Sequence, residues 1–128
     1  MQYIRPLSME DAVGAITGSD GVAAILAGGS DLLVRMKGGF IEPDLIVDIK
    51  AIEGLSDIRE TAEGFRIGAA GPCAVLGENA ALKAAWPGVV EGAKLIGSKQ
   101  VQGRCTIAGN LCNASPAADS VPSLVAAG

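Results

Sequence analysis

The sequence predicts an α+β fold built from two subdomains, residues 1–52 and residues 53–128. Apolar residues in the first part follow the order strand, helix, strand, helix, strand, which is typical of a small parallel βαβαβ sheet with helical crossovers. The second part changes to a hairpin followed by alanine-rich helical segments, and because no later strand closes it we expect it to be incomplete. With 49% hydrophobic residues, the 128-residue chain can fill a core and is not expected to be disordered.

The first half of the parallel unit carries clear boundary signals. Residues 3–4 predict a short strand that Pro6 ends. Ser8 is placed to cap a helix, with Asp11 three residues later as its capping-box partner. Apolar residues then recur at helical spacing until the segment from Gly18 to Gly21 ends the helix. The sequence therefore predicts a strand and an amphipathic helix before residue 22.

The second half of the unit runs through a glycine pair. Residues 22–26 form an apolar run short enough for a buried strand, and this run leads directly into Ala-Gly-Gly-Ser at residues 27–30. Ser30 is predicted to cap a helix that starts at Asp31 and stops at the glycine pair 38–39. Residues 45–49 then predict the third strand.

The pattern of the second subdomain is less regular. Residues 55–60 and 65–69 predict an antiparallel hairpin with a polar turn between them. Residues 72–96 predict helices with a break before Pro87, whereas residues 97–116 show no convincing periodicity. A last helix is predicted to begin near Asp119.

Composition limits the chemistry that the side chains can perform. The chain has no histidine, which removes the commonest general base and most transition-metal sites, so any chemistry must come from carboxylates, thiols, hydroxyls or a cofactor. A net charge of −4 with only 3% aromatic residues argues against nucleic-acid binding. Three cysteines without a CxxC motif favour a reducing compartment, and no apolar run is long enough for a membrane span. We therefore expect a cytoplasmic protein.

Segment 27–33, defined here as Ala27 to Leu33, is the first candidate binding site. A strand, two glycines and a helix start present unpaired backbone N–H groups, to which glycine allows close approach, and these suit a phosphate or diphosphate. Its sequence matches neither GxGxxG nor Walker A, so a tight turn with a serine cap is the alternative. If a diphosphate lies here, Gly29→Val is expected to abolish its binding.

Segment 103–119, defined as Gly103 to Asp119, is the second candidate site. No carboxylate occurs between residues 92 and 118, so Lys94, Lys99 and Arg104 create a local positive charge where an anion is expected to bind. The segment is also rich in hydroxyl, amide and glycine groups, which are supplied by Thr106, Gly109, Asn110, Asn113 and Ser115. The alternative is a solvated polar loop that Asp119 caps. Cys105 and Cys112 are expected to be small buried residues.

Both segments resemble those of one known family. Ala27-Gly28-Gly29-Ser30-Asp31-Leu32-Leu33, followed later by Thr106-Ile107-Ala108-Gly109-Asn110-Leu111-Cys112-Asn113, is similar to the FAD-binding medium subunit of the molybdenum hydroxylases. That family includes carbon monoxide dehydrogenase and xanthine dehydrogenase. The resemblance extends over the whole chain, although family members are more than twice as long, and Ala108 stands where the family usually has glycine.

The resemblance implies a vanillyl-alcohol oxidase or PCMH-type FAD-binding domain whose two subdomains enclose FAD. By family pattern, the diphosphate and the neighbouring sugar would lie against Ala27, Gly28, Gly29, Ser30, Asp31, Leu32 and Leu33. Thr106, Ile107, Ala108, Gly109 and Asn110 would form the opposite side of the site. Asn113 and Asp119 would accept hydrogen bonds from hydroxyl or ring donors.

The resemblance also implies partners. Electrons would pass from a molybdopterin-containing large subunit through a [2Fe-2S] small subunit to FAD here, and then to an external acceptor, in a hetero-oligomer that could attach to the inner face of the membrane. No side chain of this chain would then be catalytic, and none would be a metal ligand. A stand-alone flavin-dependent reductase of the same fold is one alternative. A truncated nucleotide-binding or docking module without catalysis is the other.

Overall fold

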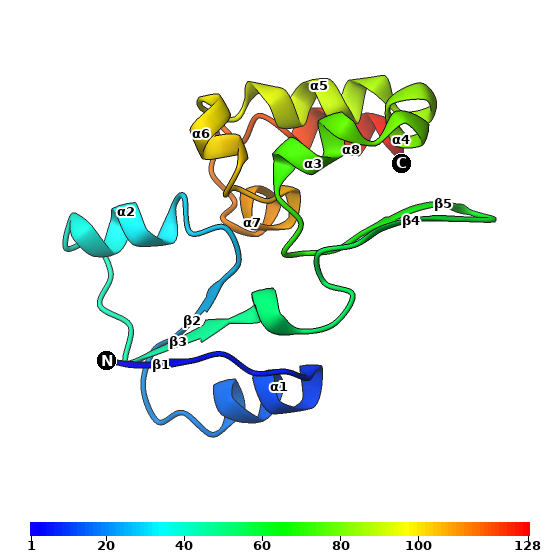
Figure 1. Ribbon diagram of the computed structural model, residues 1–128. Coiled ribbons are helices and arrows are strands. Elements are labelled where there is room, and N and C mark those ends of the chain that lie inside the picture. The colour runs from blue at the N-terminus through cyan, green and yellow to red at the C-terminus, as the bar shows by residue number, and fades with distance from the viewer.

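The computed structural model describes residues 1–128 and confirms the α+β class (Figure 1). A three-stranded parallel sheet lies in the N-terminal part, and a two-stranded antiparallel hairpin with six helices forms the C-terminal part. Each part has its own hydrophobic cluster. Buried apolar residues thus gather in two separate clusters, one beside the parallel sheet and one among the C-terminal helices.

The N-terminal sheet has the strand order β1 (Gln2–Ile4), β3 (Leu45–Asp48), β2 (Ala23–Leu26), with both pairs parallel. All four residues of the central strand β3 are buried, as expected for a strand with neighbours on both sides. The register places Leu26, the last residue of β2, beside Asp48, the last residue of β3. The three strands thus end together, next to the glycine pair that follows β2.

Two helices accompany this sheet, and Figure 1 shows them on opposite sides of it. Helix α1 (Met9–Thr17) packs against β3, and its Ala12 joins a buried cluster with Leu45, Val47 and Ile52. The predicted cap of α1 is confirmed, because the Ser8 hydroxyl accepts a hydrogen bond from the N–H of Asp11 at 3.1 Å. Helix α2 (Leu32–Lys37) follows the glycine pair, and a short 3-10 turn, η1 (Ile49–Ala51), follows β3.

The predicted cap of α2 is wrong. The residue before this helix is Asp31, not Ser30, and its side chain makes no capping hydrogen bond. Gly29 turns the chain with φ of +80°, so that residues 30 and 31 lie in the turn and the helix begins at Leu32. The backbone N–H groups at this helix start consequently remain without side-chain acceptors.

The C-terminal part begins with the predicted hairpin and continues in short helices. Its elements are β4 (Ile58–Thr61), β5 (Gly64–Ile67), α3 (Cys73–Glu78), α4 (Ala80–Ala85), α5 (Pro87–Leu95), α6 (Lys99–Gln102), α7 (Ile107–Cys112) and α8 (Val121–Ala127). The hairpin strands are shorter than predicted because β4 begins only at Ile58 and β5 already ends at Ile67, whereas the turn has only two residues, since Thr61 pairs with Gly64. The break before Pro87 is confirmed. No helix is both long and apolar enough to cross a membrane.

The core of this part joins the helices to segment 103–119. Its nine buried residues are Cys73, Leu76, Leu82, Val89, Val90, Ala93, Ile96, Cys105 and Ile107. The N–H of Cys73 donates to the carbonyl of Cys105 at 2.9 Å, which attaches the start of the segment to α3. Burial raises the pKa of the Cys73 thiol to about 12, so this thiol is protonated at neutral pH. The expectation that Cys105 is a small buried residue is confirmed.

Two helices in residues 97–116 were not predicted. Helices α6 and α7 have only four and six residues, which is too short to show a hydrophobic period. Each nevertheless has a hydroxyl cap: Ser98 accepts from the N–H of Val101, and Thr106 accepts from the N–H of Gly109. Ser98 and Thr106 were therefore the residues in the sequence that could have indicated the starts of α6 and α7.

Candidate functional site

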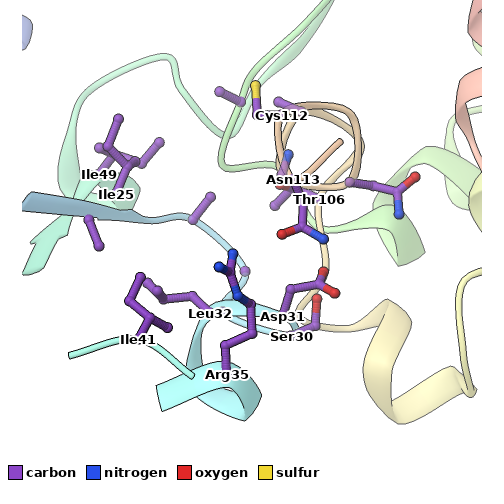
Figure 2. Close-up of a pocket in the computed structure, with 18 residues that line it drawn as sticks. Ile25, Ser30, Asp31, Leu32, Arg35, Ile41, Ile49, Thr106, Cys112 and Asn113 are labelled. Carbon is purple, nitrogen blue, oxygen red and sulfur yellow. Dashed lines mark hydrogen bonds between the residues drawn. The ribbon is translucent and has the colours of Figure 1, made fainter. Parts of the chain in front are cut away.

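A cavity of about 390 Å³ lies between segment 27–33 and segment 103–119 (Figure 2). This volume falls within the range of about 300–1,000 Å³ that is usual for ligand pockets. Figure 2 shows Ser30 and Asp31 on one side and Thr106 and Asn113 on another. The lining residues are Ala24, Ile25, Ala27, Gly28, Gly29, Ser30, Asp31, Leu32, Arg35, Ile41, Ile49, Ala69, Thr106, Ala108, Gly109, Asn110, Cys112 and Asn113.

Eleven of the fourteen predicted site residues line this cavity, and three do not. Ile107 is only 7% exposed because its side chain belongs to the core of the C-terminal part. Leu33 and Asp119 are exposed and lie outside the lining. The fold thus brings the two predicted segments together, although residues 34–102 separate them in the sequence.

Unpaired backbone N–H groups are the main chemical feature of the site. Those of Gly28, Gly29, Ser30 and Asp31 donate to no acceptor in the protein. At the start of α7 the N–H groups of residues 107 and 108 are likewise free, whereas that of Gly109 is used by Thr106. Free N–H groups at two converging helix starts favour an anionic ligand.

The two glycines of segment 27–33 are needed for different reasons. A Cβ on Gly28 would overlap the Arg104 carbonyl oxygen and lie 2.7 Å from the Cα of Cys105, so glycine here allows segment 103–119 to approach. Gly29 has φ of +80°, a conformation that L side chains rarely adopt. Gly28 therefore joins the two segments, and Gly29 forms the turn.

Segment 103–119 presents its polar groups through α7. The Oδ1 atom of Asn110 accepts two hydrogen bonds from buried Ser120, one from the Ser120 hydroxyl at 2.6 Å and one from the Ser120 backbone N–H at 3.3 Å. These bonds leave the Asn110 amide N–H groups to donate to a ligand. Ala108, where the related family usually has glycine, lies in α7 and does not have a positive φ, so its methyl group causes no backbone strain.

The cation that lines the cavity is not one of those predicted. Lys94, Lys99 and Arg104 do not line it, so the expectation that their charge marks the anion site is not met. Arg35 of α2 lines the cavity instead, and Figure 2 shows its side chain pointing inward. Arg35 lies three residues after Leu32, on the same helix face, and this spacing was the signal that could have identified it.

One cysteine, Cys112, lines the cavity. Cys112 lines the cavity and is exposed, so the expectation that it is buried is wrong. Its position at the C-terminal end of α7 turns it away from the core that holds Cys105. No three His, Cys, Asp or Glu side chains are grouped so that they could hold a metal ion.

Thr106→Val is expected to lower the free energy of unfolding by about 1 kcal/mol, the usual loss when a helix cap is removed. Thr106 is 2% exposed, and its Oγ1 accepts from the N–H of Gly109 at 2.9 Å. Urea denaturation measures the loss. Thr106→Ser keeps the hydroxyl and should recover most of the stability; equal destabilisation by both substitutions would contradict the capping role.

The whole chain matches one family model. Residues 1–128 match the model described as the FAD binding domain in molybdopterin dehydrogenase. Among curated proteins, the carbon monoxide dehydrogenase medium chain of Hydrogenophaga pseudoflava is 38% identical over 120 residues, which cover 92% of this chain and 41% of that protein. The nicotinate dehydrogenase FAD-subunit of Eubacterium barkeri is 29% identical over 124 residues, covering 96% of this chain and 42% of that protein.

A solved structure has the same fold. The reconstituted CO dehydrogenase from Oligotropha carboxidovorans superimposes with a TM-score of 0.88 at 36% sequence identity, covering 94% of this chain and 42% of the compared chain. The chain described here therefore spans about two fifths of the length of the proteins that it matches.

Proposed function

Because this chain belongs to the family of FAD-binding domains in molybdopterin dehydrogenases, we propose that it forms the FAD-binding part of a molybdenum hydroxylase medium subunit. FAD is the cofactor of this family. The observation that carries the proposal is the cavity between the two segments, where N–H groups from two helix starts have no acceptor. We further propose that residues 1–52 and 53–128 are the two subdomains of a PCMH-type FAD-binding domain.

The residues present fit the diphosphate of FAD. Four consecutive free N–H groups, at residues 28–31, supply donors to an anion, and Arg35 supplies a positive charge on the same side of the cavity. Thr106, Gly109 and Asn110 would lie on the opposite side, with the Asn110 amide as a donor. Asn113 also lines the cavity. We propose that it binds a hydroxyl or ring group of the cofactor.

The chain's own part in the reaction is to bind and orient. Bound FAD supplies the oxidation and reduction chemistry, since a flavin can accept and release electrons. None of the proposed roles requires a side chain to act as a general base, and this agrees with a sequence that contains no histidine. The apolar residues Ile25, Ile41 and Ile49 line the cavity beside the polar groups and would exclude water from the bound cofactor.

We propose that the electrons come from partner subunits, a molybdopterin-containing large subunit and a [2Fe-2S] small subunit, and leave FAD for an external acceptor. The names of the two relatives given above refer to different substrates, carbon monoxide and nicotinate, although both match almost all of this chain. This supports the view that residues 1–128 handle the electrons and that the substrate is selected elsewhere in the complex.

An absorption titration of the purified protein with FAD tests the proposal. We expect saturation near one FAD per chain, with shifted flavin bands, after removal of free cofactor. A colourless protein that takes up no FAD would contradict the proposal and would favour a docking module without cofactor. Binding of ADP in competition with FAD is also expected, because the free N–H groups would recognise the diphosphate that the two molecules share.

A further inference from the structure

Three strand ends of the N-terminal sheet are linked by a network of side chains, the Tyr3–Asp48–Lys50 network. The Tyr3 hydroxyl donates to Oδ2 of Asp48 at 2.5 Å. The Lys50 ammonium lies 2.7 Å from Oδ1 of Asp48 and donates to the carbonyl oxygen of Ala27 at 3.0 Å. The network therefore runs from β1 through the end of β3 to the residue that precedes Gly28.

Asp48 is the fixed centre of this network. It is only 4% exposed, at the end of the central strand. Burial raises the pKa of its carboxyl group, but the hydrogen bonds from Lys50 and Tyr3 outweigh burial and hold that pKa below its usual value. Asp48 is accordingly ionised at neutral pH and can orient the Lys50 ammonium.

The Lys50 ammonium makes a second contact besides its ion pair with Asp48. Both carboxylate oxygens already accept other hydrogen bonds, Oδ1 from the N–H of Lys50 at 3.1 Å and Oδ2 from Tyr3. The buried acid would thus keep a donor on each oxygen without the ammonium. The contact that only the ammonium makes is the one to the Ala27 carbonyl.

That carbonyl belongs to the peptide group that joins Ala27 to Gly28. The group is planar and trans, so its C=O and N–H point in opposite directions. Lys50 holds the carbonyl oxygen on its own side, which leaves the Gly28 N–H on the other side, with no acceptor in the protein. If the Ala27–Gly28 peptide turned over, the Ala27 carbonyl oxygen, with its partial negative charge, would replace the Gly28 N–H donor beside the proposed diphosphate.

We propose that Lys50 is a positioning residue for FAD: through the Ala27 carbonyl it fixes the peptide whose Gly28 N–H binds the diphosphate, while Asp48 and Tyr3 fix Lys50. This inference rests on the proposed FAD site. It adds a role for three residues outside both binding segments, and none of the three lines the cavity.

Lys50→Met tests the proposal, because methionine keeps much of the side-chain length and removes the ammonium. FAD affinity is measured by quenching of flavin fluorescence, and the bound diphosphate is followed by its two 31P NMR resonances. We expect the dissociation constant to rise about tenfold, the loss typical of one hydrogen bond that involves a charged group. The 31P resonances should move toward those of free FAD.

Two further lysine variants separate positioning from general stability. Lys50→Arg keeps the charge and the donors, so it should restore affinity to within about threefold of wild type. Lys83→Met removes an exposed lysine of α4 that does not line the cavity and should change neither the affinity nor the 31P spectrum. Tyr3→Phe removes only the outer hydrogen bond and should weaken binding less than Lys50→Met does.

The outcomes distinguish this inference from the proposed function. If wild type takes up no FAD, the proposed function fails and this inference fails with it. If wild type binds FAD but Lys50→Met has the same affinity and 31P spectrum, only the positioning role is overturned. Equal losses of affinity and of thermal stability in Lys50→Met and Lys50→Arg would also overturn it, because they would indicate a purely structural role.

Discussion

Gly28→Ala is expected to abolish FAD binding at micromolar concentrations, with a rise of roughly 100-fold in the dissociation constant. The new Cβ would overlap the Arg104 carbonyl oxygen and lie 2.7 Å from the Cα of Cys105. Both neighbours are backbone atoms, so the clash cannot be relieved by a side-chain rotation. Segment 103–119 must move away from segment 27–33, and the loss of two hydrogen bonds to the diphosphate, at about 1.5 kcal/mol each, accounts for that factor.

The same substitution should also lower the free energy of unfolding by about 1–3 kcal/mol, as overpacking commonly does. Fluorescence titration and urea denaturation measure the two effects. Gly14→Ala is the matched control: a Cβ on this α1 residue would meet no atom within 4 Å. It should leave FAD affinity unchanged and raise stability by about 0.5–1 kcal/mol. Wild-type affinity in Gly28→Ala would show that the two segments do not form one site.

Leu76→Ala is expected to lower the free energy of unfolding by about 2–5 kcal/mol, a large share of the 5–15 kcal/mol usual for a protein domain. Leu76 is fully buried in α3, within the cluster that also holds Cys105 and Ile107. The cavity that the substitution leaves would loosen the core that supports segment 103–119. We therefore expect FAD affinity to fall together with the urea midpoint.

Excess FAD should restore part of the lost stability of Leu76→Ala, because a ligand that binds only the folded state stabilises it. Val125→Ala serves as the control. Val125 is a residue of α8 that is 76% exposed, so its truncation should change stability by no more than about 0.5 kcal/mol. An undiminished urea midpoint in Leu76→Ala would contradict the placement of this residue at the centre of the core.

The sequence was most informative where structure is set by neighbouring residues. The α1 cap at Ser8 is formed within one helical turn, and the β4–β5 hairpin pairs residues that lie close in sequence. The three strands of the N-terminal sheet follow from apolar runs bounded by glycine and proline. Helices α6 and α7 were missed because four and six residues do not establish a period, although their caps at Ser98 and Thr106 were visible.

The site required contacts that no local pattern contains. The two segments were recognisable, but the reason for Gly28 lies in the backbone of Arg104, 76 residues later in the chain. Gly29→Val is still expected to abolish FAD binding. The reason is distortion of the turn, not direct obstruction of the diphosphate. Its Cβ would lie 2.8 Å from Leu26 Cδ1, and valine would strain a backbone with φ of +80°.

The charges of the site were also misplaced by sequence reasoning. Lys94, Lys99 and Arg104 stand in a stretch without carboxylates, but the fold directs that stretch over several helices and none of the three lines the cavity. Arg35 does line it because it shares a helix face with Leu32. The bond between Lys50 and the Ala27 carbonyl joins residues 23 positions apart and depends on the register of β2 with β3.

A crystal structure of the protein with FAD would test the central claim most directly, namely that the cavity between the two segments is the FAD site. We predict the diphosphate oxygens within hydrogen-bond distance of the N–H groups of Gly28 to Asp31, about 2.7–3.2 Å. The Asn110 amide is predicted to donate to the cofactor from the opposite side. Electron density for the diphosphate elsewhere on the protein, with the cavity filled only by water, would contradict the claim.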